Sequence, residues 1–362
     1  MPGDLSDDGA IRRVAFILIA LAIIIAGLAY GRSFLVPIVI AILITMLVGA
    51  GADRLKRLGV PEPLATLSAV VVLVIVITVV FNALAAQAES VAQAWPRYIE
   101  RLNVMADQLL RWAGPQLASK VSEAVTNLDL VRQIPGLVGS AGSFLVNVVL
   151  VAIYVGFLLA ERGRLTRKIH LLASNTRHAG DMQLGITAVS ESIRRYLWIK
   201  TVMSLLTSAV SYATLKAIGV DFAETWALII FLLNYIPSIG AFVGVAFPAL
   251  LAIIQFDTLW QFFTIATLLA GAHVIIGNVI EPSLMGRTLN LSPFVLIASL
   301  GFWAMIWGIP GAILSVPLTT SLIIVCSHIP SLRWAAVLLS AEDPMALDAV
   351  PLNDNGAPKD CC

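Results

Sequence analysis

The residues of this chain that could do chemistry are a few polar and ionisable side chains inside long apolar stretches. Asn278 and Glu281 lie at the end of one such stretch, and His273 lies eight residues before Glu281. Residues eight apart on a helix share nearly the same face, so His273 and Glu281 could relay protons. An acid inside a membrane is costly and by default indicates function. The alternatives are an interfacial Glu281 paired with Arg287 and a hydrogen-bonded packing role for His273.

Two other apolar stretches have an awkward length. Residues 223–256 and 292–328 would each be roughly 50 Å long as one straight helix, which exceeds a hydrocarbon core of about 30 Å. Pro and Gly near the middle, at 234–240 and 308–311, favour either a single broken helix or a re-entrant pair of half-helices. Both alternatives stay open from the sequence.

Breaks of this kind have a chemical consequence in lipid. The freed backbone groups must be buried in protein or line a water-filled cavity, and half-helix ends carry partial charges that suit small polar or ionic solutes. Two breaks in matching positions are the sequence pattern of a transporter's binding site. Asn234, beside the first break, could bind such a solute or could satisfy the freed carbonyl groups.

Other kinds of chemistry find no support in the sequence. There is no phosphate-binding loop of the G-x-x-x-x-G-K-[ST] type, so an ATP-driven motor is not expected. The four histidines have no metal-ligand spacing, and no nucleophile elbow is present. We therefore expect a protein that is not an enzyme, with no catalytic residues, no metal and no cofactor.

The composition indicates where these residues lie. Of 362 residues, 59% are hydrophobic and only 12% charged, about half the charged fraction of a soluble chain. Mean hydropathy is +0.92, which places the chain in a lipid bilayer. The formal net charge of +1 gives no reason to expect a nucleic-acid partner.

The apolar pattern predicts an all-α, polytopic transmembrane protein with about eight hydrophobic units, two of them broken or re-entrant. The expected units cover residues 14–30, 34–51, 64–86, 144–160, 201–219, 223–256, 259–280 and 292–328. The expected division of the chain has four parts. They are N-terminal helices 1–3 (1–86), an amphipathic extracytoplasmic helical insert (87–140), a transport core with a cytoplasmic basic segment at 161–200 (141–330), and a cytoplasmic tail (331–362).

Positive charge predicts the orientation. Arg12 and Arg13 precede the first span, three basic residues follow the second, and the segment 161–200 is strongly basic, so we expect these parts in the cytoplasm. The acidic loop 219–225 then lies outside. Segment 281–291 is outside if both long stretches cross once and inside if both turn back. Both termini are cytoplasmic in either case.

Three blocks of the chain resemble the autoinducer-2 exporter (AI-2E) family of bacterial membrane proteins. The most specific is GNVIEPSLMGRTLNLSP at 277–293, which resembles the family's G-N-x-(I/V)-x-P signature. An upstream block at 234–248 has the family's Pro-x-x-Gly pattern, and WGIPGA at 307–312 with Pro317 resembles its third block. The resemblance covers nearly the whole chain.

The resemblance implies a multi-pass carrier of the bacterial inner membrane that works without ATP hydrolysis, with discontinuous helices at the transport site. It implies export of a small polar solute, such as the quorum-sensing signal autoinducer-2, by a homo-oligomer, and the subunit number that the resemblance implies is five. Together with the breaks, it predicts substrate-binding residues at Asn234, Pro237, Gly240, Gly277, Asn278, Glu281, Pro282, Gly286, Pro310 and Gly311, with ion coupling at Glu281 and His273.

Two other functions remain open. Some members of the family look like sodium or lithium/proton antiporters, which would need an essential ionisable residue such as Glu281. A non-transporting membrane scaffold that organises partners through the insert 87–140 is the alternative from a different class. In all cases we expect the lipid bilayer as a partner, with a small polar solute or a monovalent cation as cargo.

Overall fold

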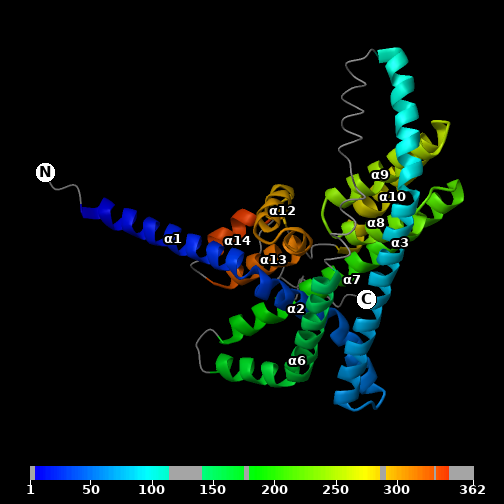
Figure 1. The fold of residues 1–362 in the computed structure, drawn as a ribbon. Helices are drawn as coiled ribbons and strands as arrows, with labels where there is room; N and C mark the ends of the chain where they lie inside the picture. The colour runs from blue at the N-terminus through cyan, green and yellow to red at the C-terminus, as the bar shows by residue number, and fades with distance from the viewer. Residues whose placement is uncertain (1–4, 114–140, 175–178, 286–290, 330–331, 342–362) are drawn as a thin grey trace, which may run out of the picture.

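Helices make up almost all of the computed structural model, which describes residues 5–113, 141–174, 179–285, 291–329 and 332–341 (Figure 1). The helices are α1 (Leu5–Tyr30), α2 (Arg32–Arg57), α3 (Glu62–Ala113), α6 (Ala141–Ser174), α7 (Ala179–Ile218), α8 (Ala223–Leu233), α9 (Ile239–Gln255), α10 (Trp260–Ile275), the π-helix η1 (Ile276–Ile280), α11 (Glu281–Met285), α12 (Pro293–Trp307), α13 (Ile309–His328) and α14 (Arg333–Leu339). Among these residues the one strand-like pairing is an isolated antiparallel bridge between Leu291 and Ser340. The predicted all-α class is confirmed.

The described helices are apolar enough for a multi-pass membrane protein. Five are long enough to span a bilayer, and five shorter apolar helices accompany them. Those five spans are Arg32–Gly49, Pro63–Val91, Thr187–Ile218, Trp260–Met285 and Ile309–His328. Segment 70–80 of α3 is rich in valine and isoleucine yet is helical, because in lipid a helix satisfies every backbone group within the segment. Val72 and Val79 are 59% and 61% exposed, as expected for a face turned to lipid.

Two helices continue past the expected ends of their segments. α3 has 52 residues and continues through residue 86, where the sequence predicted the end of a span, so residues 87–113 belong to the same helix. The remainder of the expected insert, 114–140, lies outside the described residues. α7 likewise continues through residue 200, the expected end of the basic segment. At roughly 78 Å, α3 is far longer than a hydrocarbon core and projects from the bundle (Figure 1).

Contacts at the projecting part of α3 explain why Pro96 does not end the helix. The hydroxyl of Tyr98 and the guanidinium of Arg97 both donate to the Asp221 carboxylate, at 2.6 and 2.7 Å. Arg101 donates to the carbonyl oxygen of Gln255 at 2.9 Å. These contacts tie α3 to the loops that flank α8 and α9, so tertiary contacts offset the one backbone hydrogen bond that the proline removes.

The stretch 223–256 folds as a hairpin, α8–α9, rather than as one broken span. Its two ends meet, since the Asp221 amide donates to Gln255 Oε1 and Gln255 Nε2 donates to the Gly219 carbonyl oxygen, both at 2.8 Å. With 11 residues, α8 is roughly 16 Å long, about half of the hydrocarbon core. At the tip, a Cβ on Gly240 would lie 2.2 Å from the Leu233 carbonyl oxygen, so only glycine allows the turn.

The stretch 292–328 is a second hairpin, α12–α13. Gly308 makes the turn with φ of 67°, and a Cβ on Gly311 would lie 1.9 Å from the Trp303 carbonyl oxygen. Leu291, before α12, packs with Ile323 and Cys326 near the end of α13, so both ends of this hairpin also lie together. Neither stretch is therefore a single broken crossing, because each turns back on itself as a pair of helices.

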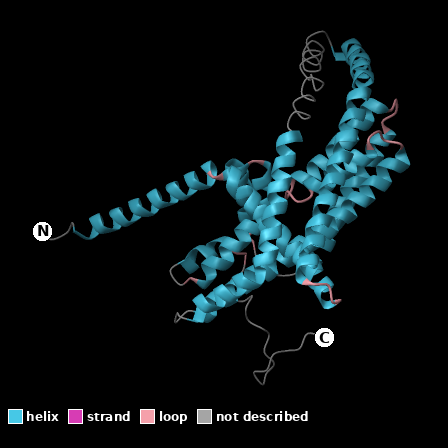
Figure 2. Ribbon diagram, turned by 60° about the horizontal axis from the view of Figure 1, so that its bottom comes forward, coloured by secondary structure: helices cyan, strands magenta, loops and turns pink. Residues whose placement is uncertain are grey.

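Figure 2 shows that nearly all of the described residues are helical and that short loops join the helices. The long helix α7 packs against both hairpins. Its first half packs against α2 and the second hairpin, through Ile193 and Leu197 beside Leu43 and Leu314. Its second half packs against the first hairpin, where Ser208 donates to the Ala227 carbonyl oxygen at 2.7 Å. Each hairpin therefore lies against its own part of α7.

Candidate functional site

The second half of α7 carries a line of polar side chains within an apolar span. The line consists of Lys200, Ser204, Thr207, Ser208 and Ser211, at the three- and four-residue spacing of one helix face. Ser204 and Ser211 are completely buried, and Thr207 is 2% exposed. The Thr207 hydroxyl donates to the carbonyl oxygen of Met203, one turn earlier on the same helix. Ser211 Oγ has no hydrogen-bond partner among the described residues. We refer to this line as the α7 polar face.

An ion pair lies at one end of the α7 polar face. Lys200 Nζ donates to Glu281 Oε1 at 2.7 Å, and the two side chains are only 10% and 14% exposed. The sequence predicted a role for Glu281 with Arg287 as the alternative partner. Arg287 lies outside the described residues, and the observed partner of Glu281 is Lys200, which the sequence grouped with the cytoplasmic basic segment. An ion pair with so little exposure strongly couples the two residues, because removing either leaves an uncompensated buried charge.

The tip of the first hairpin contacts the same face of α7. Asn234 Nδ2 donates to Ser204 Oγ at 3.0 Å, and the hydroxyls of Tyr235 and Thr201 are 2.7 Å apart. Asn234 was predicted from the sequence, whereas Ser204, Thr201 and Tyr235 were missed. Pro237 is half-buried and Gly240 is buried at this tip, where both shape the turn.

A π-helical turn precedes Glu281. Residues 276–280 form η1, between α10 and the short α11 that Glu281 begins. Such π-turns are rare and frequently lie at functional sites. Gly277 has open space where a Cβ would be, and Asn278 and Pro282 are exposed, so none of these three contacts the ion pair through a buried side chain. Gly286 lies outside the described residues.

His273 faces the first hairpin. Its Nδ1 lies 2.9 Å from the Leu269 carbonyl oxygen, and Nε2 is buried without a hydrogen-bond partner among the described residues. A Cβ on Gly244 of α9 would lie 3.2 Å from this Nε2, so the imidazole packs closely against α9. The described contacts of His273 are thus with α9 and its own helix, and the predicted relay to Glu281 remains a prediction.

Pro310 and Gly311 belong to a different environment. Gly311 packs on the backbone of Trp303, and the Trp307 indole donates to the Leu28 carbonyl oxygen of α1 at 3.0 Å. The Trp303 indole donates to Thr319 Oγ1 at 3.1 Å. The tip of the second hairpin is thereby held by packing and indole hydrogen bonds, while the tip of the first hairpin contacts the α7 polar face.

A polar pocket lies on the side of α3 that faces the hairpin base. Its volume is about 590 Å³, and its lining includes Arg97, Arg101 and Asp257. Arg101 and Asp257 pair at 3.2 Å. Burial, followed by the hydrogen bond to Asp221, raises the pKa of the neighbouring Tyr98 above its ordinary value. The phenol is therefore a proton donor at any physiological pH, which keeps α3 attached to the α7–α8 loop.

The missed residues do have a sequence signal. Lys200, Ser204, Thr207 and Ser211 recur at helical spacing inside an apolar stretch, and polar residues that share one face of a membrane span indicate a buried interior. Length and hydropathy, which define the expected span 201–219, do not reveal this pattern of polar residues. Among the described residues, no three His, Cys, Asp or Glu side chains lie together as a metal site would require.

The α7 polar face therefore presents hydroxyl groups and Lys200, next to the Glu281 carboxylate and the Asn234 amide of the first hairpin tip. Polar groups at a broken helix within a multi-pass helical bundle are the arrangement of secondary transporters. The sequence profile described as "AI-2E family transporter" matches residues 18–331, and the chain belongs to this family.

Named relatives agree with this class. The chain is 29% identical over 348 residues to the "AI-2 transport protein TqsA" of Escherichia coli, covering 91% of this chain and 95% of the relative. Two other relatives are named "Putative transport protein". YhhT of Escherichia coli is 28% identical over 308 residues, 84% of this chain and 87% of the relative. A protein of Haemophilus influenzae is 29% identical over 336 residues, 90% and 95% of the two chains.

Proposed function

We propose that this protein is a secondary transporter that exports a small polar solute by alternating access, with the solute bound at the α7 polar face. The observation that carries the proposal is the contact between the first hairpin tip and α7, through Asn234–Ser204 and Tyr235–Thr201. Both contacts are neutral hydrogen bonds, each with a net contribution of about 0.5–1.5 kcal/mol. A solute with hydroxyl or carbonyl groups can exchange with them at little cost. Autoinducer-2 is the candidate cargo, because one relative is named "AI-2 transport protein TqsA".

The proposed movement separates the hairpin tip from α7 while the ion pair stays closed. Hydrogen bonds between neutral groups at the tip can break and re-form with a solute, whereas opening the Lys200–Glu281 pair would expose two buried charges. The base of the hairpin α8–α9 is closed by hydrogen bonds between Asp221, Gln255 and Gly219, so in this proposal the two helices tilt as a unit against α7. Tilting alternately opens the α7 polar face to either side of the membrane.

Efflux from reconstituted vesicles tests this proposal. We expect the double variant Ser204→Ala, Asn234→Leu to lower the rate of autoinducer-2 efflux at least fivefold, because both partners of the tip contact lose their polar groups. The matched control is Thr214→Val, which removes an exposed hydroxyl from the same helix, one that bonds only its own backbone. Efflux by the double variant at the wild-type rate would contradict the proposed location. No efflux by the wild-type protein, with any of a panel of small polar solutes, would favour the scaffold.

We also propose an inner-membrane orientation with both termini cytoplasmic, supported by Arg12 and Arg13 in the first part of α1 and by the basic residues in 161–200. The hairpins then enter from opposite sides, the first from outside and the second from the cytoplasm. In a variant without native cysteines, a membrane-impermeant maleimide should label Asp257→Cys in intact cells but Arg333→Cys only after lysis. The reverse pattern would contradict this orientation. The homo-oligomer stays a prediction.

Sodium or lithium/proton antiport is the second candidate, and the Lys200–Glu281 pair is the observation that favours it. A carboxylate that is 14% exposed in a membrane span can exchange its ammonium partner for a proton or a monovalent cation. In this alternative, Glu281 itself carries the coupled ion. The two candidates differ in the role of Glu281. In antiport its carboxylate binds the coupled ion, whereas in solute export it only holds Lys200 in the ion pair.

A further inference from the structure

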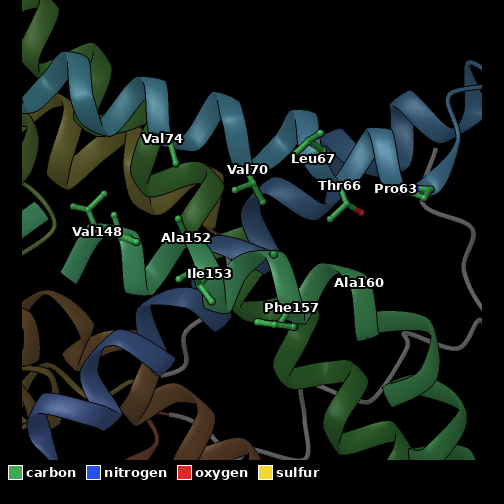
Figure 3. Close-up of a pocket in the computed structure, with 12 residues that line it drawn as sticks. Pro63, Thr66, Leu67, Val70, Val74, Val148, Ala152, Ile153, Phe157 and Ala160 are labelled. Carbon is green, nitrogen blue, oxygen red and sulfur yellow. The ribbon is translucent and has the colours of Figure 1, made fainter. Parts of the chain in front are cut away.

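An apolar groove lies between α3 and α6, away from the α7 polar face (Figure 3). Its volume is about 790 Å³, and of its twelve lining residues Thr66 alone has a polar side chain. Val70 and Val74 line it from α3, and Ala152, Gly156 and Phe157 line it from α6. The small residues of α6 leave room in the groove. At Gly156 even an added Cβ would lie 3.8 Å from a Val70 methyl group, which is ordinary van der Waals contact.

The groove has the length of one leaflet. It extends along α3 from Pro63 to Val74 and along α6 from Ala160 to Val148, with Pro63 and Ala160 at the same end (Figure 3). At 1.5 Å per residue this is roughly 17 Å, close to half of a hydrocarbon core of about 30 Å. The α3 side belongs to the membrane span Pro63–Val91. An extended acyl chain therefore fits the groove in both length and polarity.

Basic residues lie beyond the Pro63–Ala160 end of the groove. Arg164 is exposed and follows Ala160 by four residues, so it continues the α6 face that Ala152 and Gly156 present. Arg57 is exposed at the end of α2. A tight turn, in which the Val60 amide donates to the Leu55 carbonyl oxygen at 3.2 Å, keeps Arg57 next to the start of α3. Two acids, Glu62 and Glu161, belong to the same end, but Lys56, Arg57 and Arg164 leave it with an excess of basic residues, which complements the phosphate of a lipid headgroup.

From this complementarity we propose that the α3–α6 groove binds an anionic phospholipid, one acyl chain lying between α3 and α6 and the phosphate group contacting Arg57 and Arg164. The bound lipid covers the open side of a contact in which Ala69 of α3 already packs with Val151 and Val155 of α6. It joins the long helix that contacts the base of the first hairpin to the rest of the bundle. The proposal is independent of the transported solute, because neither the groove nor its basic end includes residues of the α7 polar face.

Native mass spectrometry of the purified protein tests the site, with phosphatidylglycerol and phosphatidylcholine of identical acyl chains offered in equal amounts. We expect the wild-type protein to retain phosphatidylglycerol preferentially. Gly156→Leu should lower the retained phosphatidylglycerol at least fivefold, because the leucine side chain fills the groove. The variant should still fold, since leucine favours helix more than glycine does. Gly271→Leu is the matched control, a helical glycine of α10 with open space around it.

A second variant tests the headgroup contact. Arg57→Gln with Arg164→Gln should remove the preference for phosphatidylglycerol over phosphatidylcholine, while Arg333→Gln, an exposed arginine of α14, should leave the preference unchanged. Equal lipid retention by Gly156→Leu and the wild-type protein would overturn the proposal. A lower subunit number of Gly156→Leu with unchanged lipid retention would also overturn the proposal, because the groove would then bind a second copy of the chain. An unaltered preference in the double arginine variant would also overturn it.

Discussion

Replacing Glu281 with glutamine should reduce transport at least tenfold. The substitution leaves Lys200 without its counter-charge at a position where the lysine side chain is 10% exposed. Breaking a buried ion pair by removing one partner costs about 3–5 kcal/mol. The measurement is efflux from vesicles, scaled to the amount of folded protein. Glu191→Gln is the matched control on α7, because Glu191 pairs with Arg194 at a site where both side chains are largely exposed, and such surface pairs contribute little.

The double variant Lys200→Met, Glu281→Gln distinguishes a transport role of the ion pair from a structural one. Removing both charges avoids the uncompensated lysine, and replacing a buried ion pair by uncharged residues is often neutral for stability. If the pair takes part in transport, the double variant should be as stable as the wild-type protein and still inactive. If the pair only holds α7 to α11 and stays closed, as in the export proposal, transport should return with stability, and a stable but inactive double variant would contradict that role.

The same variants decide between solute export and antiport. Sodium-dependent proton movement is measured in vesicles that contain the wild-type protein, Glu281→Gln or the double variant. Antiport by the wild-type protein that disappears in Glu281→Gln would support Glu281 as the ion-coupling residue. Antiport that is equal in the wild-type protein and in Glu281→Gln, or absent from both, would remove that candidate and leave solute efflux as the activity to which Glu281 contributes.

Substituting alanine for Gly311 should be the most destabilising single change in the second hairpin. The added Cβ would lie 1.9 Å from the Trp303 carbonyl oxygen and 2.9 Å from the Trp307 Cβ, and neither atom can move without separating α12 from α13. Overpacking of this kind costs about 1–3 kcal/mol and more where backbone must shift, so we expect a loss of at least about 3 kcal/mol. The measurement is the thermal unfolding midpoint of the purified protein in detergent.

Gly301→Ala is the matched control for Gly311→Ala. Gly301 lies in α12 of the same hairpin, but nothing is within 4 Å of the position of its Cβ. Alanine favours helix over glycine, so this control should keep or slightly raise the unfolding midpoint. Equal midpoints for Gly311→Ala and Gly301→Ala would show that the hairpin accommodates a methyl group at its tip, which would contradict the close approach of α12 and α13.

Much of the architecture follows from the sequence because it depends on local properties. Long apolar stretches must be helical in lipid, and Pro–Gly clusters in stretches too long for one span must interrupt them. The interruptions at 234–240 and 308–311 therefore correspond to real turns between helices. The end of α3 was predicted less well, because residues 87–113 become polar along the same helix. Falling hydropathy marks where the helix leaves the apolar core, and it does not mark where the helix ends.

The candidate site was only partly predictable. Asn234 and Glu281 stand out locally, one beside a break and the other as an acid at the end of an apolar stretch. Their partners do not, since Ser204 is 30 residues from Asn234 in sequence and Lys200 is 81 residues from Glu281. Pro310 and Gly311 resemble the first break in sequence, yet their neighbours are tryptophans and α1. Similar local sequences thus acquired different surroundings.

The sequence by itself determined that this chain is a bundle of membrane helices with two interruptions, because hydropathy and helix breaking act over a single segment. Only the tertiary structure decided that both interruptions turn the chain back, that Lys200 is the partner of Glu281, and that α3 and α6 leave an apolar groove between them. These features depend on which helix faces lie against each other. Helices of similar hydropathy can pack in many ways, and the choice is made by steric fit and by buried polar contacts between residues far apart in the chain.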